Sequence, residues 1–230
     1  MTWRSILSHL GVRRRFADRA AAGEELAARV AAEPNVVAPL VLALPRGGVP
    51  IAAAIAHTLQ APLDLLLVRK LGVPDQAELA MGAIAEGGVH VLNDEVVTHL
   101  GVSAAQIAQV TAKEQQELIR RAQVYRGTRA APLLEGKSVI LVDDGLATGT
   151  TMRAAIRAAR SRNPARLIVA VPVAAHDIAA ELGAEVEQLI ALEVVDDLGA
   201  IGLWYADFTQ TSDAEVCALL GGGKDIETRK

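Results

Sequence analysis

The most informative segment of this chain reads Val139-Ile-Leu-Val-Asp-Asp-Gly-Leu-Ala-Thr-Gly-Thr-Thr151. Its apolar start indicates a buried strand, two aspartates follow, and a run of small residues leads into a helix that we expect to begin near Thr151. The carboxyl end of a strand in an open parallel sheet is where ligands bind. A glycine- and threonine-rich turn that opens a helix presents backbone N–H groups and hydroxyls to an anion. The segment therefore predicts a phosphate-binding loop with two carboxylates beside it.

The two carboxylates, Asp143 and Asp144, can accept hydrogen bonds from neighbouring hydroxyl groups. A ribose 5-phosphate offers a phosphate and a pair of hydroxyls at about the right separation. An isolated Asp-Asp-Gly would more often be a turn with helix-capping aspartates, but the full pattern favours the sugar phosphate. A Walker A loop needs a lysine where this chain has Gly149-Thr150-Thr151, and a dinucleotide fold needs G-x-G-x-x-G. The pattern therefore disfavours both an NTPase and a dinucleotide enzyme.

The rest of the chain alternates between apolar, strand-like runs and helical segments. A helical pattern over residues 16–32 comes first. The strand-like runs lie at residues 36–44, 63–68, 138–142, 166–171 and 186–192. Such alternation is typical of a parallel sheet with crossover helices. We predict one α/β domain over residues 1–230, with a mainly parallel, twisted sheet and helices on both of its faces.

Composition limits the class of protein. With 230 residues, the chain is long enough for one domain with a buried core and short for two. Hydrophobic residues make up 51% and aromatic ones 3%, as expected for parallel strands covered by helices. The net charge of -4 and the dispersed basic residues argue against nucleic acid as a partner. The single cysteine, Cys217, and the lack of a signal or a membrane-spanning stretch predict a cytoplasmic protein.

Two segments depart from the alternation. Residues 71–80 indicate a loop, and residues 81–92 a short hairpin around Glu86-Gly87-Gly88. Residues from about 94 to 126 predict a helical insertion. Within it, Ser103 is a typical N-cap, and the many charged and amide side chains indicate a largely solvated helix.

The segment 139–151 resembles the phosphoribosyl pyrophosphate signature of type I phosphoribosyltransferases. Its residue pattern is similar to that of the adenine-type members. The resemblance extends to Leu44-Pro-Arg-Gly-Gly-Val-Pro50, which stands where the family binds pyrophosphate, often in a loop with a non-proline cis peptide. The residues suit that role, because Arg46 is cationic and because Gly47 and Gly48 let backbone N–H groups approach a polyanion. The resemblance implies the type I fold with a small additional hood.

Arg69 and Lys70 follow the second predicted strand. The family commonly places a basic residue here against the pyrophosphate, followed by a mobile loop that closes over the site. Exposed cations at a strand end are usually just solvated, so the prediction rests on the family position. Glu78 would belong to the closing loop.

The resemblance implies Mg²⁺-dependent displacement of pyrophosphate from the anomeric carbon of ribose by a nitrogenous base, a pentosyl transfer of nucleotide salvage. We expect Asp143 and Asp144 to orient the ribose hydroxyls, directly or through water on Mg²⁺. Arg46, Lys70 and the metal would stabilise the leaving pyrophosphate. The remaining substrate-binding residues that we expect are Ala147, Thr148, Gly149, Thr150 and Thr151 for the 5-phosphate, with Gly47, Gly48 and Arg69 for the pyrophosphate.

The acceptor base is held by a variable hood in this family, and residues from about 194 to 210 are the candidate here. Trp204 or Tyr205 could stack on a flat heterocycle, although such rings can also simply fill the edge of a core. Ala147 stands where the enzymes for 6-oxopurines carry a third carboxylate, which disfavours an oxopurine. Other regions do not resemble the adenine enzyme, so the sequence leaves the base open.

Two further functions are compatible with the same fold. One is a regulatory protein that binds phosphoribosyl pyrophosphate or a nucleotide without turnover. Arg46, Lys70 and the candidate closing loop favour catalysis over this alternative, and the lack of a basic DNA-binding module disfavours a repressor. The other is an assembly role in which residues 103–126 pack against another subunit, and a homodimer is a common state for such proteins.

Overall fold

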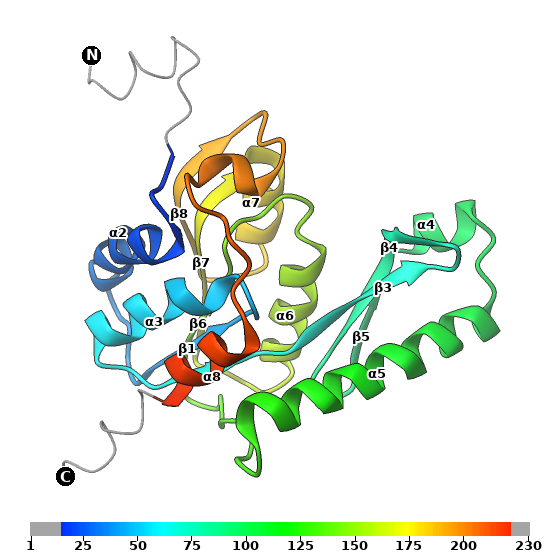
Figure 1. Ribbon diagram of the computed structural model, residues 1–230, viewed down its shortest axis with the longest axis horizontal. Helices are drawn as coiled ribbons and strands as arrows, with labels where there is room; N and C mark the ends of the chain where they lie inside the picture. The colour runs from blue at the N-terminus through cyan, green and yellow to red at the C-terminus, as the bar shows by residue number, and fades with distance from the viewer. Residues whose placement is uncertain (1–14, 222–230) are drawn as a thin grey trace.

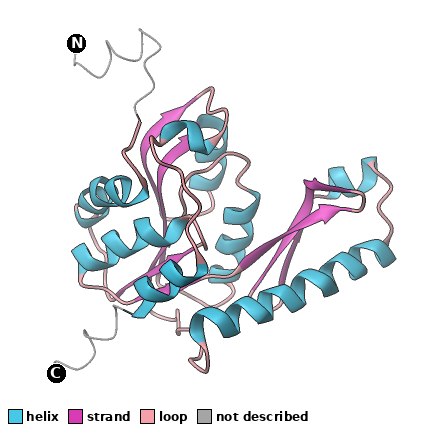
Figure 2. Cartoon of the chain, in the orientation of Figure 1, coloured by secondary structure: helices cyan, strands magenta, loops and turns pink. Residues whose placement is uncertain are grey.

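The computed structural model describes residues 15–221, the side chains of residues 77 and 78 excepted. Its elements form two lobes (Figure 1). The large lobe surrounds a parallel sheet, and the small lobe holds an antiparallel sheet with one long helix beside it (Figure 2). The predicted α/β class with a mainly parallel sheet is confirmed.

All strands of the large sheet run parallel, in the spatial order β2-β1-β6-β7-β8. They are β1 (Pro39–Ala43), β2 (Leu63–Leu65), β6 (Ser138–Val142), β7 (Arg166–Ala175) and β8 (Gln188–Val195). The helices on one face are α2 (Arg19–Ala31) and α3 (Gly48–Leu59), and those on the other are α6 (Thr150–Arg160) and α7 (His176–Gly183). The last helix, α8 (Asp213–Gly221), packs against α3.

The two faces of the large sheet bury alternate residues of the same strands. Ile140 and Ile168 pack in the cluster that contains the apolar residues of α2 and α3. Their neighbours Leu141 and Val169 pack in the cluster that contains those of α6. Because both faces are covered, every position of such a strand must be apolar. This requirement explains why the central strands stand out as continuous apolar runs in the sequence.

In the small lobe, one sequence-based prediction is wrong and another is confirmed. It contains β3 (Val68–Val73), β4 (Gln76–Ala85), β5 (Val89–Leu92), α4 (Asp94–His99) and α5 (Ala104–Arg126). The predicted loop at residues 71–80 is wrong, because β3 and β4 form an antiparallel hairpin that turns at Pro74 and Asp75. Leu71 and Met81 are fully buried in its core, which favours strand pairing over an exposed loop. The predicted hairpin around residues 86–88 is present as β4 and β5.

The predicted helical insertion consists of two helices, since the chain breaks at Gly101, where φ is +62°. Ser103 caps α5 as predicted: its Oγ accepts a bond from Gln106 N at 3.3 Å, and Gln106 Oε1 accepts one from Ser103 N at 2.9 Å. Most of α5 is exposed along the small sheet, but Leu118 and Tyr125 are buried. The expectation of a largely solvated helix therefore fails at its C-terminal end.

A buried ionic cluster joins the two lobes at the end of α5. The Arg126 side chain is 4% exposed, and its Nε donates to Asp64 Oδ1 of β2 at 2.6 Å. Its Nη1 donates to Glu86 Oε1, between β4 and β5, at 2.5 Å, and its Nη2 donates to the Leu65 carbonyl. One guanidinium thus binds both sheets.

In the described part of the chain, no helix has the length and apolar character that a membrane span requires.

Candidate functional site

Two loops leave neighbouring strands at the same edge of the large sheet. Ala43 of β1 is paired with Val142 of β6, and Leu44 N donates to the Val142 carbonyl at 2.8 Å. The loop after β1 leads into α3, which begins at Gly48, and the loop after β6 leads into α6, which begins at Thr150. The first N–H groups of a helix lack partners within the helix and attract anions. This edge therefore presents two helix N-termini side by side.

The first loop touches the second so closely that only glycine fits. The peptide bond between Pro45 and Arg46 is cis, as the resemblance implies for this loop. A Cβ on Gly47 would lie 2.1 Å from Asp144 Oδ2, and one on Gly48 would lie 2.4 Å from the Val142 carbonyl oxygen. The sequence suggested that these glycines let N–H groups approach a polyanion. The structure adds a second reason, which is the direct contact between the two loops.

The predicted phosphate loop lines a small cavity of about 140 Å³. Its lining runs without interruption from Asp143 to Met152 and includes Ile201 from the segment 194–210. Gly149, at the N-cap of α6, has a φ of +68°, and a Cβ there would lie 2.8 Å from Ile178 Cγ2. Glycine at this position therefore lets the loop turn into the helix. All five predicted phosphate-binding residues, 147–151, lie in this lining.

Asp143 and Asp144 each have one carboxylate oxygen engaged by the protein. Asp143 Oδ1 accepts a bond from Asp144 N at 2.8 Å, and Asp144 Oδ2 accepts two bonds from Arg19. The residues that the structure describes form no bond to Asp143 Oδ2 or Asp144 Oδ1. Burial and the neighbouring Asp144 charge raise the pKa of Asp143 well above its usual value. One oxygen of each carboxylate thus has no hydrogen-bond partner among the described residues, and both residues line the cavity.

Arg19, at the start of α2, is the site residue that sequence analysis missed. Its Nε and Nη2 lie 3.0 and 2.8 Å from Asp144 Oδ2, and its Nη1 donates to the Thr209 carbonyl at 2.8 Å. The guanidinium carbon lies 3.8 Å from the centre of the Phe208 ring. Nothing in the sequence marks this arginine, because its partners lie more than a hundred residues away.

The expected stacking of Trp204 or Tyr205 on a base is not supported. These residues are 4% and 2% exposed, in a cluster with Phe16. Trp204 Nε1 donates to the Leu198 carbonyl at 3.1 Å, and the Tyr205 hydroxyl donates to the Asp144 carbonyl at 2.7 Å. Burial raises the pKa of Tyr205, so the phenol stays a donor. Both rings stabilise the site from behind and present no free face.

The predicted basic residues lie in different places. Arg46 is on the first loop, and its Nη1 lies 3.6 Å from Asp213 Oδ1 of α8. The same Oδ1 accepts a bond from the Tyr125 hydroxyl of α5 at 2.7 Å. Arg46 is therefore linked through α8 to the small lobe, a contact that the sequence did not indicate.

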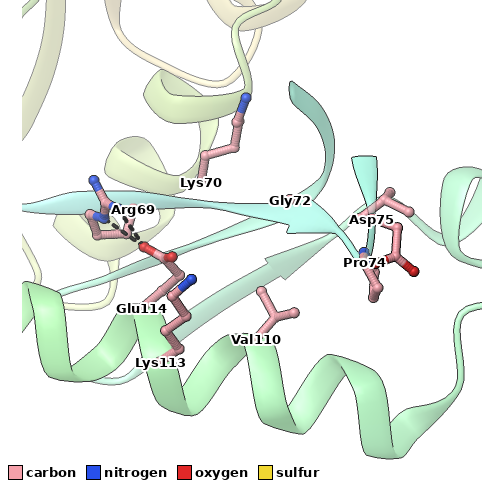
Figure 3. A pocket seen from close by; sticks show the side chains of 9 residues that line it. Arg69, Lys70, Gly72, Pro74, Asp75, Val110, Lys113 and Glu114 are labelled. Atoms are coloured by element: carbon pink, nitrogen blue, oxygen red, sulfur yellow. Dashed lines mark hydrogen bonds and ion pairs between the residues drawn. The ribbon is translucent and has the colours of Figure 1, made fainter. Parts of the chain in front are cut away.

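Arg69 and Lys70 point to opposite faces of β3 (Figure 3). Arg69 Nη2 is held by Glu114 Oε2 of α5 at 2.6 Å, in a cavity of about 370 Å³ between the hairpin and α5. Lys70 points away from α5, on the face where Val68 packs near α6. Arg69 is thus held against α5, and Lys70 lies on the side of α6. The side chain of Glu78 lies outside the described residues.

Comparison with known proteins shows the family. Residues 16–186 match the family described as "Phosphoribosyl transferase domain", and the chain belongs to it. Two Mycobacterium tuberculosis proteins, from strains CDC 1551 and H37Rv and each named "Putative phosphoribosyl transferase", are 47% identical over 205 residues. That match covers 89% of this chain and 46% of each relative, so the chain spans about half their length.

A solved structure supports the fold over nearly the whole chain. The crystal structure of the protein TT1426 from Thermus thermophilus is 40% identical in sequence and superposes with a TM-score of 0.76. The match covers 90% of this chain and 97% of that one. The fold is therefore shared with that protein over most of both chains.

Proposed function

We propose that this chain binds phosphoribosyl pyrophosphate at the edge formed by the two loops and transfers its phosphoribosyl group to a nitrogenous base. One observation carries the proposal: two helix N-termini and two open carboxylate oxygens converge there. Phosphoribosyl pyrophosphate has a phosphate, a pair of hydroxyls and a pyrophosphate. It therefore offers one chemical partner to each part of the site.

The parts of the substrate are assigned by charge and by hydrogen bonding. The 5-phosphate is assigned to the small-residue loop 147–151, where the N-terminal N–H groups of α6 and the threonine hydroxyls can donate. The ribose hydroxyls are assigned to Asp143 Oδ2 and Asp144 Oδ1, since carboxylates accept hydrogen bonds from hydroxyls. The pyrophosphate is assigned to the loop 45–48, where the N-terminus of α3 and Arg46 provide positive charge.

The two aspartates are compatible with Mg²⁺ held mainly by the substrate. Among the described residues, no group of three or more His, Cys, Asp or Glu side chains could bind a metal ion by itself. Mg²⁺ commonly keeps several waters and takes one or two carboxylates together with substrate phosphates. Asp143 and Asp144, with one open oxygen each, suit that pattern. The ion would offset the charge that develops on the departing pyrophosphate.

The chain's own residues would act by orientation and electrostatics. The bond from the anomeric carbon to pyrophosphate breaks while the base nitrogen attacks, and positive charge develops on the sugar as in glycoside chemistry. Asp143 and Asp144 would hold the ribose so that its anomeric carbon faces the base, while Arg46 stabilises the leaving group. Lys70, on the α6 face of β3, is a second cation for this role if the small lobe closes over the substrate.

The acceptor base would lie on the side of Ile201. This is the residue from the candidate hood, 194–210, that lines the cavity, and its side chain packs against Gly145. An isoleucine offers an apolar surface to a flat ring without selecting a hydrogen-bonding pattern. Specificity for one base would then come from other residues of the closed complex.

Titration calorimetry of phosphoribosyl pyrophosphate with Mg²⁺ tests the proposal. We compare the native chain with Asp143→Asn, which changes the oxygen that has no partner among the described residues. The control is Asp94→Asn, since Asp94 is exposed in the first turn of α4. We expect binding by the native chain and the control, and binding weakened about 10-fold or more by Asp143→Asn. The same samples are then screened for pyrophosphate release with a panel of bases.

The two readouts separate catalysis from sensing. Release that depends on one base would establish the transferase and identify its acceptor. Binding without release from any base would favour the non-catalytic regulatory protein. Failure of the native chain to bind phosphoribosyl pyrophosphate would overturn the proposed site.

A further inference from the structure

Asp144 is fixed on three sides by segments distant in the sequence. Arg19 of α2 binds its Oδ2, the backbone of Gly47 lies against the same oxygen, and the Tyr205 hydroxyl binds its carbonyl. By contrast, Asp143 has one bond to its carboxylate, from the next residue in the chain. The protein therefore restrains the two carboxylates of the pair to very different degrees.

The way Arg19 binds Asp144 is unusual for this pair of groups. An arginine often binds both oxygens of a carboxylate through two parallel bonds. Here Nε and Nη2 both reach Oδ2, at 3.0 and 2.8 Å, and the described residues form no bond to Oδ1 of this cavity-lining aspartate. One oxygen of this carboxylate is thus held by Arg19, and the other keeps its capacity to accept a hydrogen bond.

Arg19 is itself held firmly enough to act as a support. Its side chain is 10% exposed, Nη1 donates to the Thr209 carbonyl, and the Phe208 ring covers the guanidinium. An arginine stacked on an aromatic ring and bonded on two edges loses little further freedom when a ligand binds. Its position therefore does not depend on the substrate being present.

We infer that Arg19 is a positioning residue of the sugar subsite, which fixes the Asp144 carboxylate so that Oδ1 faces a ribose hydroxyl. The inference rests on the proposed function. The positive charge of Arg19 also offsets repulsion between the two adjacent carboxylates, so that both can approach one sugar. Because the bonds of Arg19 go to Asp144 and Thr209, and none among the described residues goes to the loop 45–48, its loss should weaken binding of the ribose part more than binding of pyrophosphate.

Dissecting the ligand tests this selectivity. Calorimetry is run with three probes: phosphoribosyl pyrophosphate with Mg²⁺, ribose 5-phosphate, and pyrophosphate with Mg²⁺. The variants are Arg19→Gln, which removes the charge, and Arg19→Lys, which keeps the charge but loses the two-nitrogen contact. Arg29→Gln is the matched control, because Arg29 is exposed on the same helix.

We expect Arg19→Gln to weaken ribose 5-phosphate and phosphoribosyl pyrophosphate about 10-fold or more and to change pyrophosphate binding less than about 2-fold. Arg19→Lys should recover part of the loss, and Arg29→Gln should behave like the native chain. If turnover is observed, KM for phosphoribosyl pyrophosphate should rise more than kcat falls. Phe208→Leu keeps the ion pair but removes the supporting ring. We therefore expect it to weaken ribose 5-phosphate selectively as well, but by a smaller factor than Arg19→Gln.

Each outcome distinguishes the inference from the proposed function. A native chain that binds none of the probes overturns both. A native chain that binds, with Arg19→Gln binding ribose 5-phosphate equally well, overturns only the role of Arg19. Equal weakening of ribose 5-phosphate and pyrophosphate would mean that Arg19 merely supports the fold. Thermal unfolding shows whether Arg19→Gln folds. If it does not, Arg19→Lys and Phe208→Leu provide the test, and the inference fails if neither weakens ribose 5-phosphate more than pyrophosphate.

Discussion

The large lobe and the small lobe are held in place by different kinds of contact. The large sheet is buried on both faces by helices, through apolar side chains that alternate along β6 and β7. The small lobe also has apolar contacts, but its junction with the large sheet contains the buried Arg126 cluster and the Tyr125–Asp213 bond. Apolar packing is spread over many contacts, whereas the polar junction depends on a few groups. A single substitution should therefore detach the small lobe more easily than it disturbs the loop between β6 and α6.

The largest effect is expected from Arg126→Met. Removing this guanidinium leaves the Asp64 and Glu86 carboxylates without their buried partner, which typically costs about 3–5 kcal/mol. We expect amide hydrogen exchange to increase in α5 and β5 and to stay slow in β6 and β7. Arg120→Met is the control, since that arginine is 55% exposed on α5. Equal loss of protection in both lobes would show that they unfold as one unit.

The next effect is expected from Gly48→Ala, measured by denaturant unfolding. The new methyl group would lie 2.4 Å from the Val142 carbonyl and 3.0 Å from the Asp143 Cα, both of them backbone atoms that cannot move aside easily. We expect a loss of about 3 kcal/mol. Gly87→Ala is the matched substitution in the small lobe, where a Cβ meets nothing within 4 Å but φ is +86°. That variant should lose only about 1 kcal/mol, and a reversed order would contradict the picture of a tight large lobe.

The smallest effect is expected from Tyr125→Phe, which removes one bond between the lobes and should cost about 1 kcal/mol. Burial is the largest cause that raises the pKa of Tyr125 from 10.0 to about 12, and the bond to Asp213 is the next. A group whose folded pKa is raised stabilises the fold below its unfolded pKa and loses that contribution as pH rises through the folded value. The stability difference between native and Tyr125→Phe should thus shrink between about pH 10 and pH 12. A difference independent of pH would mean that Tyr125 ionises as freely in the folded state as in the unfolded chain.

Parts of the fold could be predicted because their signals are local. The buried strands appear as apolar runs, since both of their faces are covered, and the N-cap at Ser103 depends on residues one turn away. The segment 139–151 was recognisable because strand, carboxylates, small residues and helix follow one another without a break. The hairpin β3–β4 was missed because Gly72, Pro74 and Asp75 dominate its composition, while burial of Leu71 and Met81 decides its structure.

The other parts of the site depend on contacts between distant segments. Arg19 binds Asp144 across 125 positions, and Tyr125 reaches Asp213 across 88. No local pattern distinguishes Arg19, Tyr125 or Asp213 from ordinary surface residues. The burial of Trp204 likewise requires Phe16, which packs beside it from the other end of the described chain. Sequence patterns thus located the loops that would bind phosphate, but not the groups that hold those loops in place.

The pairing of early and late segments has a consequence for biosynthesis. Phe16 pairs with Tyr205, Asp207 N donates to the Ala17 carbonyl, and Arg19 binds Thr209 as well as Asp144. A nascent chain that has emerged only to residue 200 already contains both loops, yet Arg19 has no carbonyl or ring to hold it beside Asp144. Contacts of such large sequence separation form late in folding. The contacts that hold Arg19 beside Asp144 are therefore completed only when nearly the whole domain has left the ribosome, so a truncated chain would carry the motif without this support.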